Sequence, residues 1–321
     1  MKDHNLKSGA IRSRMCRRYG GGMEITMKID LKRVAPIGNI VSGGQDGAIY
    51  GKYLFSINSK GNANVYDIDS FGGKVTPDMK IDTFTLDRAE LICPHSNAVC
   101  FGREFYEEGD EFPLLYTNIY NNYAKAAEPL KGVCLVYRVM RDGNKFSTAL
   151  VQIIEIGFTE DASLWKMSED ADCTRPYGNF TVDAEKGVYY AFTMRAESDG
   201  TRYFAFDIPR ARDGEMSEKF GVKKVVLKKE DIKYFFDCEH HYFLQGACCH
   251  NSLIYSLEGF HTDELPPRLR VIDPVEKKQL LAVDLRKFTL GIEPEFIDFR
   301  GDTCYYCDER GNLYIMEFEN R

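Results

Sequence analysis

Ten polar, charged or aromatic side chains occupy one recurring kind of position in this chain, shortly before a run of apolar residues. They are Gln45, Asp46, His95, Asn97, Arg175, Tyr177, Asn179, Gln245, Glu293 and Glu295. Amides and carboxylates form hydrogen bonds with ligand hydroxyls, an aromatic ring stacks on a sugar ring, and an arginine holds an anion. We therefore interpret this set as a candidate binding site for a polar ligand.

Two other roles are open for the same side chains. Buried polar groups need hydrogen-bond partners, so the ten residues can instead hold neighbouring parts of the fold together. Asp46, Glu293 and Glu295 are acids, which leaves a divalent cation open as well. No cofactor is expected, because the sequence has no G-x-S-x-G elbow, H-E-x-x-H helix or G-x-x-x-x-G-K-[ST] loop.

The polar positions belong to five short tags that divide the chain into self-similar units. The tags are Gln45-Asp46-Gly47, His95-Ser96-Asn97, Tyr177-Gly178-Asn179, Leu244-Gln245-Gly246 and Glu293-Pro294-Glu295. Each tag precedes strand-like sequence such as AVCFG, and a later run such as VYDID carries charges on one side. Units that cannot bury both faces alone must stack on one another, and the tags would then ring one mouth of a central channel. The pattern predicts an all-β, five-bladed β-propeller, with the longest interval explained by an insertion around residues 103–111.

The turns within each unit predict four-stranded antiparallel blades. Breaker-rich segments such as Ser59-Lys60-Gly61-Asn62 and Arg300-Gly301-Asp302 separate the apolar runs. The last unit ends one strand short, and residues 24–34 alternate apolar and polar side chains before the first tag. We expect this N-terminal strand to complete the last blade and close the ring, which removes an exposed sheet edge.

The chain divides into a tail and one domain. Residues 1–22 are basic and end in three glycines, which indicates a disordered tail or a start codon placed too early. Residues 23–321 form the single propeller domain. Residues 159–171 contain a helix start signal and the lone tryptophan, Trp165, so we expect a short helix or an excursion between blades there.

Composition excludes several classes of partner. The net charge is −7 and aromatic residues make up 13% of the chain, which fits a globular β protein and argues against nucleic-acid binding. The basic pairs Lys223-Lys224 and Lys228-Lys229 are expected on a solvated edge. No stretch is long and apolar enough to cross a membrane, and no apolar export signal is visible, so we expect a cytoplasmic protein.

The cysteines and histidines outside the tags suggest no metal site. Most of the ten cysteines lie in apolar runs, which favours free, buried thiols. Cys304 and Cys307 have the spacing of half a zinc site, but residues three apart on a strand point to opposite faces. The adjacent pair His240-His241 is expected in an exposed loop.

One alternative is an enzyme that hydrolyses a glycan or a related polar substrate. Asp46 faces Glu293 or Glu295 if blade 5 neighbours blade 1 in a closed ring, and glycoside hydrolysis requires two such carboxylates. Residues 46–54 (DGAIYGKYL) also resemble the first-blade motif of five-bladed glycosidases, in which an aspartate serves as base. The other blade starts depart from that family, because they hold His95, Tyr177 and Gln245 instead of the required acids.

The tags themselves resemble the rim motifs of five-bladed propellers in teichoic-acid-related proteins and phage receptor-binding proteins. The matching residues are His95 with Asn97, Gln245-Gly246, and Glu293-Pro294-Glu295; Phe296 departs from the glycine more usual in that family. The resemblance implies a rim that binds a polar ligand such as a glycan, without a defined catalytic role.

We therefore expect a non-catalytic scaffold that binds a polar small molecule or glycan at the rim of its channel. His95, Asn97, Asn179, Gln245 and Glu295 are the expected core of the site. The alternatives are a hydrolase that uses Asp46 and Glu295 and a protein-interaction platform on the outer or lower face.

Overall fold

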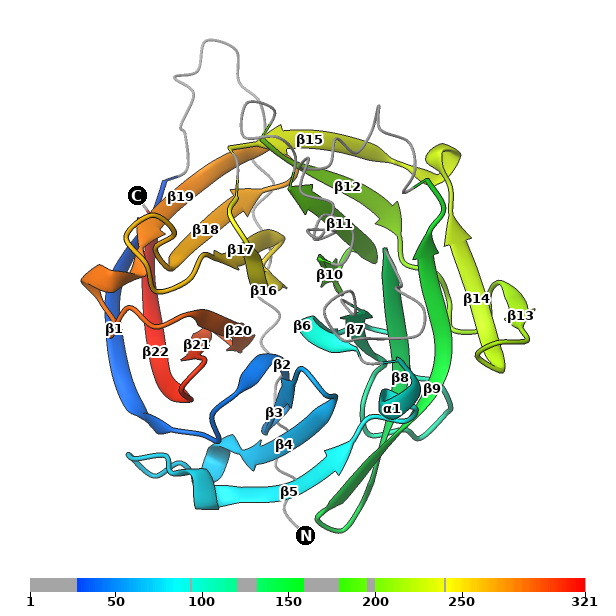
Figure 1. Cartoon of the computed structure of the whole chain (residues 1–321), viewed down its shortest axis with the longest axis horizontal. Coiled ribbons are helices and arrows are strands. Elements are labelled where there is room, and N and C mark those ends of the chain that lie inside the picture. Colours follow the sequence, from blue (N-terminus) through cyan, green and yellow to red (C-terminus); the bar gives the residue numbers. More distant parts are fainter. Residues whose placement is uncertain are drawn as a thin grey trace, which may run out of the picture.

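The computed structural model shows five β-sheets arranged around a central axis (Figure 1). The residues described are 28–92, 94–119, 132–158, 179–194, 200–239 and 241–320. Each sheet contains a set of four antiparallel strands that runs outward from the axis. The all-β, five-bladed propeller is thereby confirmed.

Blades 1 and 2 contain the first complete repeats. From the axis outward, blade 1 consists of β2 (Gly44–Tyr50), β3 (Tyr53–Asn58), β4 (Asn62–Asp67) and β5 (Lys80–Thr85). Blade 2 consists of β6 (His95–Phe101), β7 (Leu115–Ile119), β8 (Val133–Asp142) and β9 (Lys145–Ile156). The aromatic and β-branched residues of these strands pack well on a pleated surface.

Blades 3 and 4 follow the same plan. Blade 3 consists of β10 (Phe180–Asp183), β11 (Val188–Met194), β12 (Thr201–Asp207) and β15 (Tyr234–Cys238). Blade 4 consists of β16 (Leu244–His250), β17 (Leu253–Glu258), β18 (Arg268–Asp273) and β19 (Lys278–Asp284). The β16–β17 hairpin turns through Asn251 and Ser252, both of which have positive φ, as a two-residue turn with matching twist requires.

Blade 5 is completed by the N-terminal strand. It consists of β20 (Pro294–Arg300), β21 (Thr303–Asp308), β22 (Asn312–Asn320) and β1 (Ile29–Asn39). β1 pairs antiparallel with β22 over its whole length, and Figure 1 shows the blue strand outside the red one. The predicted closure of the ring is confirmed; among the described residues the strand covers 29–39, which extends five residues beyond the predicted end at 34.

Blade 2 carries an addition that the repeat does not require. Between β12 and β15 the chain leaves blade 3 and forms β13 (Glu215–Ser217) and β14 (Val222–Leu227). β14 pairs parallel with β9, and β13 pairs with β14, so this sheet has six strands. The detour therefore fastens blade 3 to the outside of blade 2 (Figure 1).

The hydrophobic core lies between the blades. Five apolar clusters of buried residues each combine side chains from two neighbouring blades. Phe55 of blade 1 packs with Leu115 of blade 2, for example, and Phe204 of blade 3 packs with Tyr116 of blade 2. Each blade thus needs both neighbours, which is the physical reason for closing the ring.

Helices are few and short in the described ranges. They are the 3₁₀ turns η1 (Ile68–Ser70), η2 (Pro77–Met79), η5 (Lys229–Asp231) and η6 (Leu285–Lys287), and α1 (Ala89–Ile92). Among the helices described, none has the length and apolar character to span a bilayer. The predicted tail (1–22) and the Trp165 segment (159–171) lie outside the described residues.

Candidate functional site

The tags coincide with irregularities at the start of the innermost strands. The strand register shifts between Gly44 and Asp46 in β2, between Leu244 and Ala247 in β16 and between Pro294 and Phe296 in β20. β6 shifts between His95 and Val99. Such β-bulges change the direction in which nearby side chains point. The tag residues therefore do not follow the regular alternation of a strand.

Two hydrogen bonds join blade 5 to its neighbours through tag residues. The Gln45 side-chain amide donates to Glu295 Oε1 at 3.3 Å, linking blade 1 to blade 5. Gln245 Nε2 donates to Glu293 Oε1 at 2.6 Å, linking blade 4 to blade 5. Four of the predicted site residues are thereby brought together in two pairs.

Two tag asparagines converge on blade 4. Asn97 of blade 2 and Asn179 of blade 3 both donate to the Leu244 carbonyl, at 3.4 and 3.2 Å. Asn97 also accepts from Asn118 Nδ2 at 2.5 Å, and Asn118 in turn accepts from the Ala98 N–H. Because β16 contacts β2 and β6 on other sides of the ring, the inner strands touch across the axis at this level.

The predicted residues form two layers that differ in exposure. Asp46, Asn97, Asn179, Gln245 and Glu295 are between 1% and 7% exposed. Gln45, His95 and Glu293 are partly exposed. The partly exposed side chains reach solvent, and the buried ones are almost completely covered. Arg175 and Tyr177 lie outside the described residues.

Two carboxylates cap the backbone of the next blade. Asp46 Oδ2 accepts from the Val99 N–H at 2.7 Å, from blade 1 to blade 2. Asp298 Oδ2 accepts from the Ile49 N–H at 2.7 Å, from blade 5 to blade 1. Inner strands have an edge with unpaired N–H groups, and these two acids satisfy part of it. Asp298 was not among the predicted residues, and its position inside an apolar run gave no signal.

Burial shifts the titration of these acids. Burial raises the pKa of Asp46 well above its usual range, against the opposing effect of the backbone N–H groups that it accepts from. Burial, with Glu293 nearby, raises the pKa of Glu295 in the same way. Burial raises the pKa of Asp298 to about 7. Asp46 Oδ1 and Glu295 Oε2 make no hydrogen bond with the described residues, so neutral carboxyls at these positions would avoid a buried charge that these oxygens leave without a partner.

The backbone is strained at the blade 2 tag. His95 and Ser96 have φ values of 61° and 57°, a left-handed conformation that costs a residue with a side chain about 1–2 kcal/mol. Ser96 is fully buried, and its hydroxyl finds no hydrogen-bond partner in the part of the chain that the structure describes. Strain that persists in a folded protein is often found at ligand sites.

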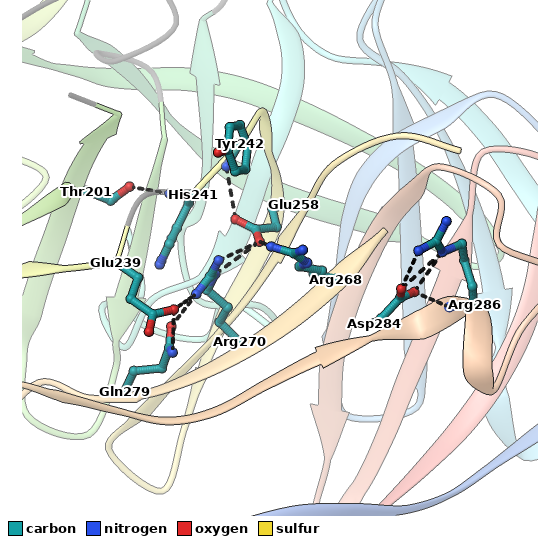
Figure 2. A network of polar contacts seen from close by, with 10 residues as sticks. All are labelled: Thr201, Glu239, His241, Tyr242, Glu258, Arg268, Arg270, Gln279, Asp284 and Arg286. Carbon is teal, nitrogen blue, oxygen red and sulfur yellow. Dashed lines mark hydrogen bonds and ion pairs between the residues drawn. The ribbon is translucent and has the colours of Figure 1, made fainter. Parts of the chain in front are cut away.

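An ion-pair network built around the buried pair Arg270 and Glu258 joins blades 3 and 4 (Figure 2). Arg270 donates through Nε and Nη2 to Glu258 Oε1 at 3.1 and 2.9 Å, and through Nη1 to Glu239 Oε2 at 2.9 Å. Burial raises the pKa of Glu258, and the Arg270 guanidinium opposes that rise. Sequence analysis did not find this network, because its members lie in separate segments of the sequence. Glu258 and Arg270 each lie in an ordinary strand sequence.

His241 takes part in the same junction. His241 is completely buried. Its backbone N–H donates to Thr201 Oγ1 at 2.9 Å, and its imidazole Nδ1 lies 3.3 Å from the Tyr203 hydroxyl. The expectation that it lies in an exposed loop was wrong, because the segment after β15 folds inward to meet blade 4. His240 lies outside the described residues.

The cysteines agree with the expectation of free thiols where they are described. Cys100, Cys134, Cys248, Cys304 and Cys307 are free and buried, and two others are free and partly exposed. Burial raises the pKa of the Cys304 thiol well above its usual range, which suppresses the reactive thiolate. In the described ranges, no three His, Cys, Asp or Glu side chains form a group that could hold a metal ion.

Comparison with known proteins finds solved structures of low similarity and no sequence match. No protein-family model and no curated protein sequence matches the chain. Myxococcus xanthus glutaminyl cyclase is 9% identical, with 91% of this chain and 97% of that chain covered and a TM-score of 0.49. The designed Ika8 protein is 8% identical (88% and 99% covered, TM-score 0.34), and Kuenenia stuttgartiensis hydrazine synthase is 11% identical (90% and 76% covered, TM-score 0.37).

These likenesses carry no argument about activity. The five-bladed propeller expected from the tags is confirmed by the sheet topology. The finer resemblance to teichoic-acid-related and phage receptor-binding propellers stays a prediction, as does ligand binding by the tag residues.

Proposed function

We propose that the chain is a non-catalytic scaffold that binds a polar ligand, such as a sugar, at the end of the ring where the tags begin the innermost strands. The observation that carries this proposal is the layering of the tags. Gln45, His95 and Glu293 are partly exposed, and two of them, Gln45 and Glu293, form hydrogen bonds with the buried Glu295 and Gln245. Ligand-facing groups held by a bonded layer are typical of preorganised binding sites.

The chemistry of the exposed layer suits a ligand with several hydroxyl or amide groups. A glutamine side chain both donates and accepts, a glutamate accepts, and an imidazole does either according to its tautomer. The strained backbone at His95 supports this assignment, because it fixes the direction in which that side chain leaves the strand.

Burial of the acids supports a binding role over hydrolysis. A general acid must come within hydrogen-bond reach of the atom that it protonates, and Asp46 and Glu295 are only 1% and 3% exposed. Asp46 Oδ2 accepts from the Val99 N–H of blade 2, and a Cβ added at Gly246 of blade 4 would lie only 2.7 Å from Oδ1, so both oxygens are closely covered. A hydrolase acting through these two residues remains the alternative.

The proposal is tested by the thermal stability of the purified chain. The midpoint of unfolding is measured with sugars, sugar phosphates, nucleotides and divalent cations, because a ligand that binds only the folded state raises the midpoint. We expect a sugar or sugar phosphate to raise it, and His95→Ala and Glu293→Gln each to abolish the shift while the ligand-free midpoint stays close to that of the native chain.

The control is His261→Ala, which removes an exposed histidine between β17 and β18. A shift that survives in both rim variants, or no shift with any compound, contradicts the proposed site. Product formation from a glycan substrate that stops in Asp46→Asn or Glu295→Gln, with folding intact, supports the hydrolase instead.

A further inference from the structure

The detour that extends blade 2 creates a cleft on the outside of the ring. The chain leaves blade 3 after Asp207 and returns at Lys233, and a cavity of about 490 Å³ lies between these two segments and the end of β14. This site is on the outer wall of the propeller and does not include any tag residue. Its volume is within the range of sites that hold small ligands or a few side chains of a partner.

The floor of this cleft is apolar. Phe206 and Leu227 are buried members of the cluster between blades 2 and 3, and Ile208, Val225 and Ile232 pack against that cluster while remaining partly exposed. The cleft therefore opens onto the hydrophobic core. Covering such side chains removes apolar area from water, which is favourable by about 25 cal/mol per Å².

The edge of the cleft is acidic. It carries the carboxyl groups of Asp207, Asp213, Glu230 and Asp231, against the single ammonium of Lys233. Lys233 is already paired with Asp207, at 2.5 Å.

Two of the acids are held in place by the detour itself. Asp213 accepts from the Arg210 N–H at 2.9 Å, and Asp231 accepts from the Lys228 N–H at 2.7 Å. Backbone N–H groups fix a carboxylate without cancelling its charge. The cleft thus presents a positioned negative edge around an apolar floor.

A second cleft on the same hairpin has a different character. It lies beside β13 and β14 and is lined by Met216 and Val226 with Lys224, Lys228 and a single acid, Glu215. The contrast shows that the acidic edge belongs to the first cleft and not to the hairpin as a whole.

We propose that the cleft between Asp207 and Lys233 binds a segment of a partner protein in which an apolar side chain is flanked by lysine or arginine. The apolar side chain covers Ile208, Val225 and Ile232, and the flanking cations meet Asp213, Glu230 and Asp231, which form no ion pair with any other described residue. Charge complementarity of this kind steers association and weakens with salt. The site is separate from the rim and does not depend on the function proposed there.

The test is direct binding of a fluorescein-labelled ten-residue peptide, measured by fluorescence anisotropy at low and physiological salt. An array of peptides with a central Leu-Phe between pairs of Lys or Arg provides the probes. We expect at least one to bind, and to bind at least tenfold more weakly when Leu-Phe is replaced by Ser-Ser.

Two charge-reversal variants locate the site. Glu230→Lys places a cation on the edge of the cleft, and Glu218→Lys makes the same change at an exposed position of the hairpin that lines neither cleft. We expect at least a tenfold loss of affinity in the first and less than a twofold change in the second, with unchanged thermal midpoints in both. His95→Ala should bind like the native chain.

Four results would overturn the proposal. They are no binding by any peptide of the array, equal weakening by Glu230→Lys and Glu218→Lys, equal binding of the Ser-Ser peptide, and full displacement by millimolar spermidine. The second and third indicate general charge attraction, and the last indicates a site for free polyamines.

Discussion

At the scale of single residues, the inner ring depends on acids that are costly to ionise. Asp46 and Asp298 each satisfy a backbone N–H of the next blade, yet burial raises the pKa of both. The backbone hydrogen bonds favour the ionised carboxylate, whereas burial away from water favours the neutral carboxyl group. The stability of the ring is therefore coupled to protonation near neutral pH.

The first prediction concerns Asp298. Its pKa is raised to about 7 in the folded state and is about 3.9 in an unfolded chain. The stabilising contribution of its proton is complete below pH 4 and is lost as the pH rises through 7, by at most about 4 kcal/mol. In Asp298→Asn, urea unfolding from pH 4 to 8 should show a flatter pH profile than the native chain. An unchanged profile would exclude Asp298 as the titrating group.

The second prediction concerns the strained tag of blade 2. Ser96→Gly should raise the free energy of unfolding by about 1 kcal/mol, because glycine adopts a positive φ without steric cost. Ser96→Ala removes the same buried hydroxyl and keeps the Cβ, so the difference between the two variants isolates the backbone effect. Equal stabilities by urea unfolding would mean that the left-handed conformation costs nothing here.

At the scale of elements, the junction of blades 3 and 4 combines apolar packing with the Arg270 network. Arg270 and Glu258 lie on neighbouring strands of blade 4, and Glu239 follows β15 of blade 3. The network therefore fixes the path of the chain as it crosses between the blades.

The third prediction is that this pair is strongly coupled. Arg270→Met should lower the free energy of unfolding by about 3 kcal/mol, because the buried Glu258 loses both hydrogen bonds from Arg270 and keeps only the Tyr242 N–H and the Arg268 guanidinium at 3.8 Å. The double variant with Glu258→Gln should recover part of the loss. Arg33→Ala, which breaks an exposed pair with Glu317, should cost less than about 1 kcal/mol. Additive losses in a chemical denaturation cycle would show that the pair does not act as a unit.

The repeat in the sequence predicted the blades but not the elements that depart from it. The tags and turns mark the start and end of strands because local side chains determine them. The parallel pairing of β14 with β9 joins segments distant in sequence, and local patterning contains no information about such a pairing. Lys228 and Lys229 were expected on a solvated edge and are exposed, but the detour that carries them was not foreseen.

For the candidate site, the sequence predicted which residues lie on neighbouring blades, but not their contacts or their burial. Gln45, Gln245, Glu293 and Glu295 could be placed together because the closed ring makes their blades neighbours. The sequence could not show that Asn97 reaches the Leu244 carbonyl, or which members of the set are buried. Those properties depend on how bulges turn the side chains and how closely the inner strands approach across the axis.

At the scale of the whole molecule, β1 is the closing strand of the ring. It covers the edge of β22, and its Ile29 and Leu31 are buried in the cluster between blades 4 and 5. Without it, blade 5 would keep an open edge and part of that cluster would meet water.

The fourth prediction is that closure controls stability and solubility. A chain that begins at Ile40 lacks all of β1 and should unfold at a much lower temperature and aggregate, because unpaired edges associate. A chain that begins at Met23 retains β1 and provides the control. Scanning calorimetry and light scattering distinguish the two outcomes. A native-like midpoint for the shorter chain would contradict the closure argument.

The pairing of β1 with β22 also determines when the ring can close during synthesis. β1 leaves the ribosome before every other strand, but its partner β22 begins only at Asn312. At about 5–20 residues per second, β1 waits roughly 15–60 s for its partner. During this time the nascent ring is open, so the period in which molecular chaperones matter most for this protein lasts until β22 has been made.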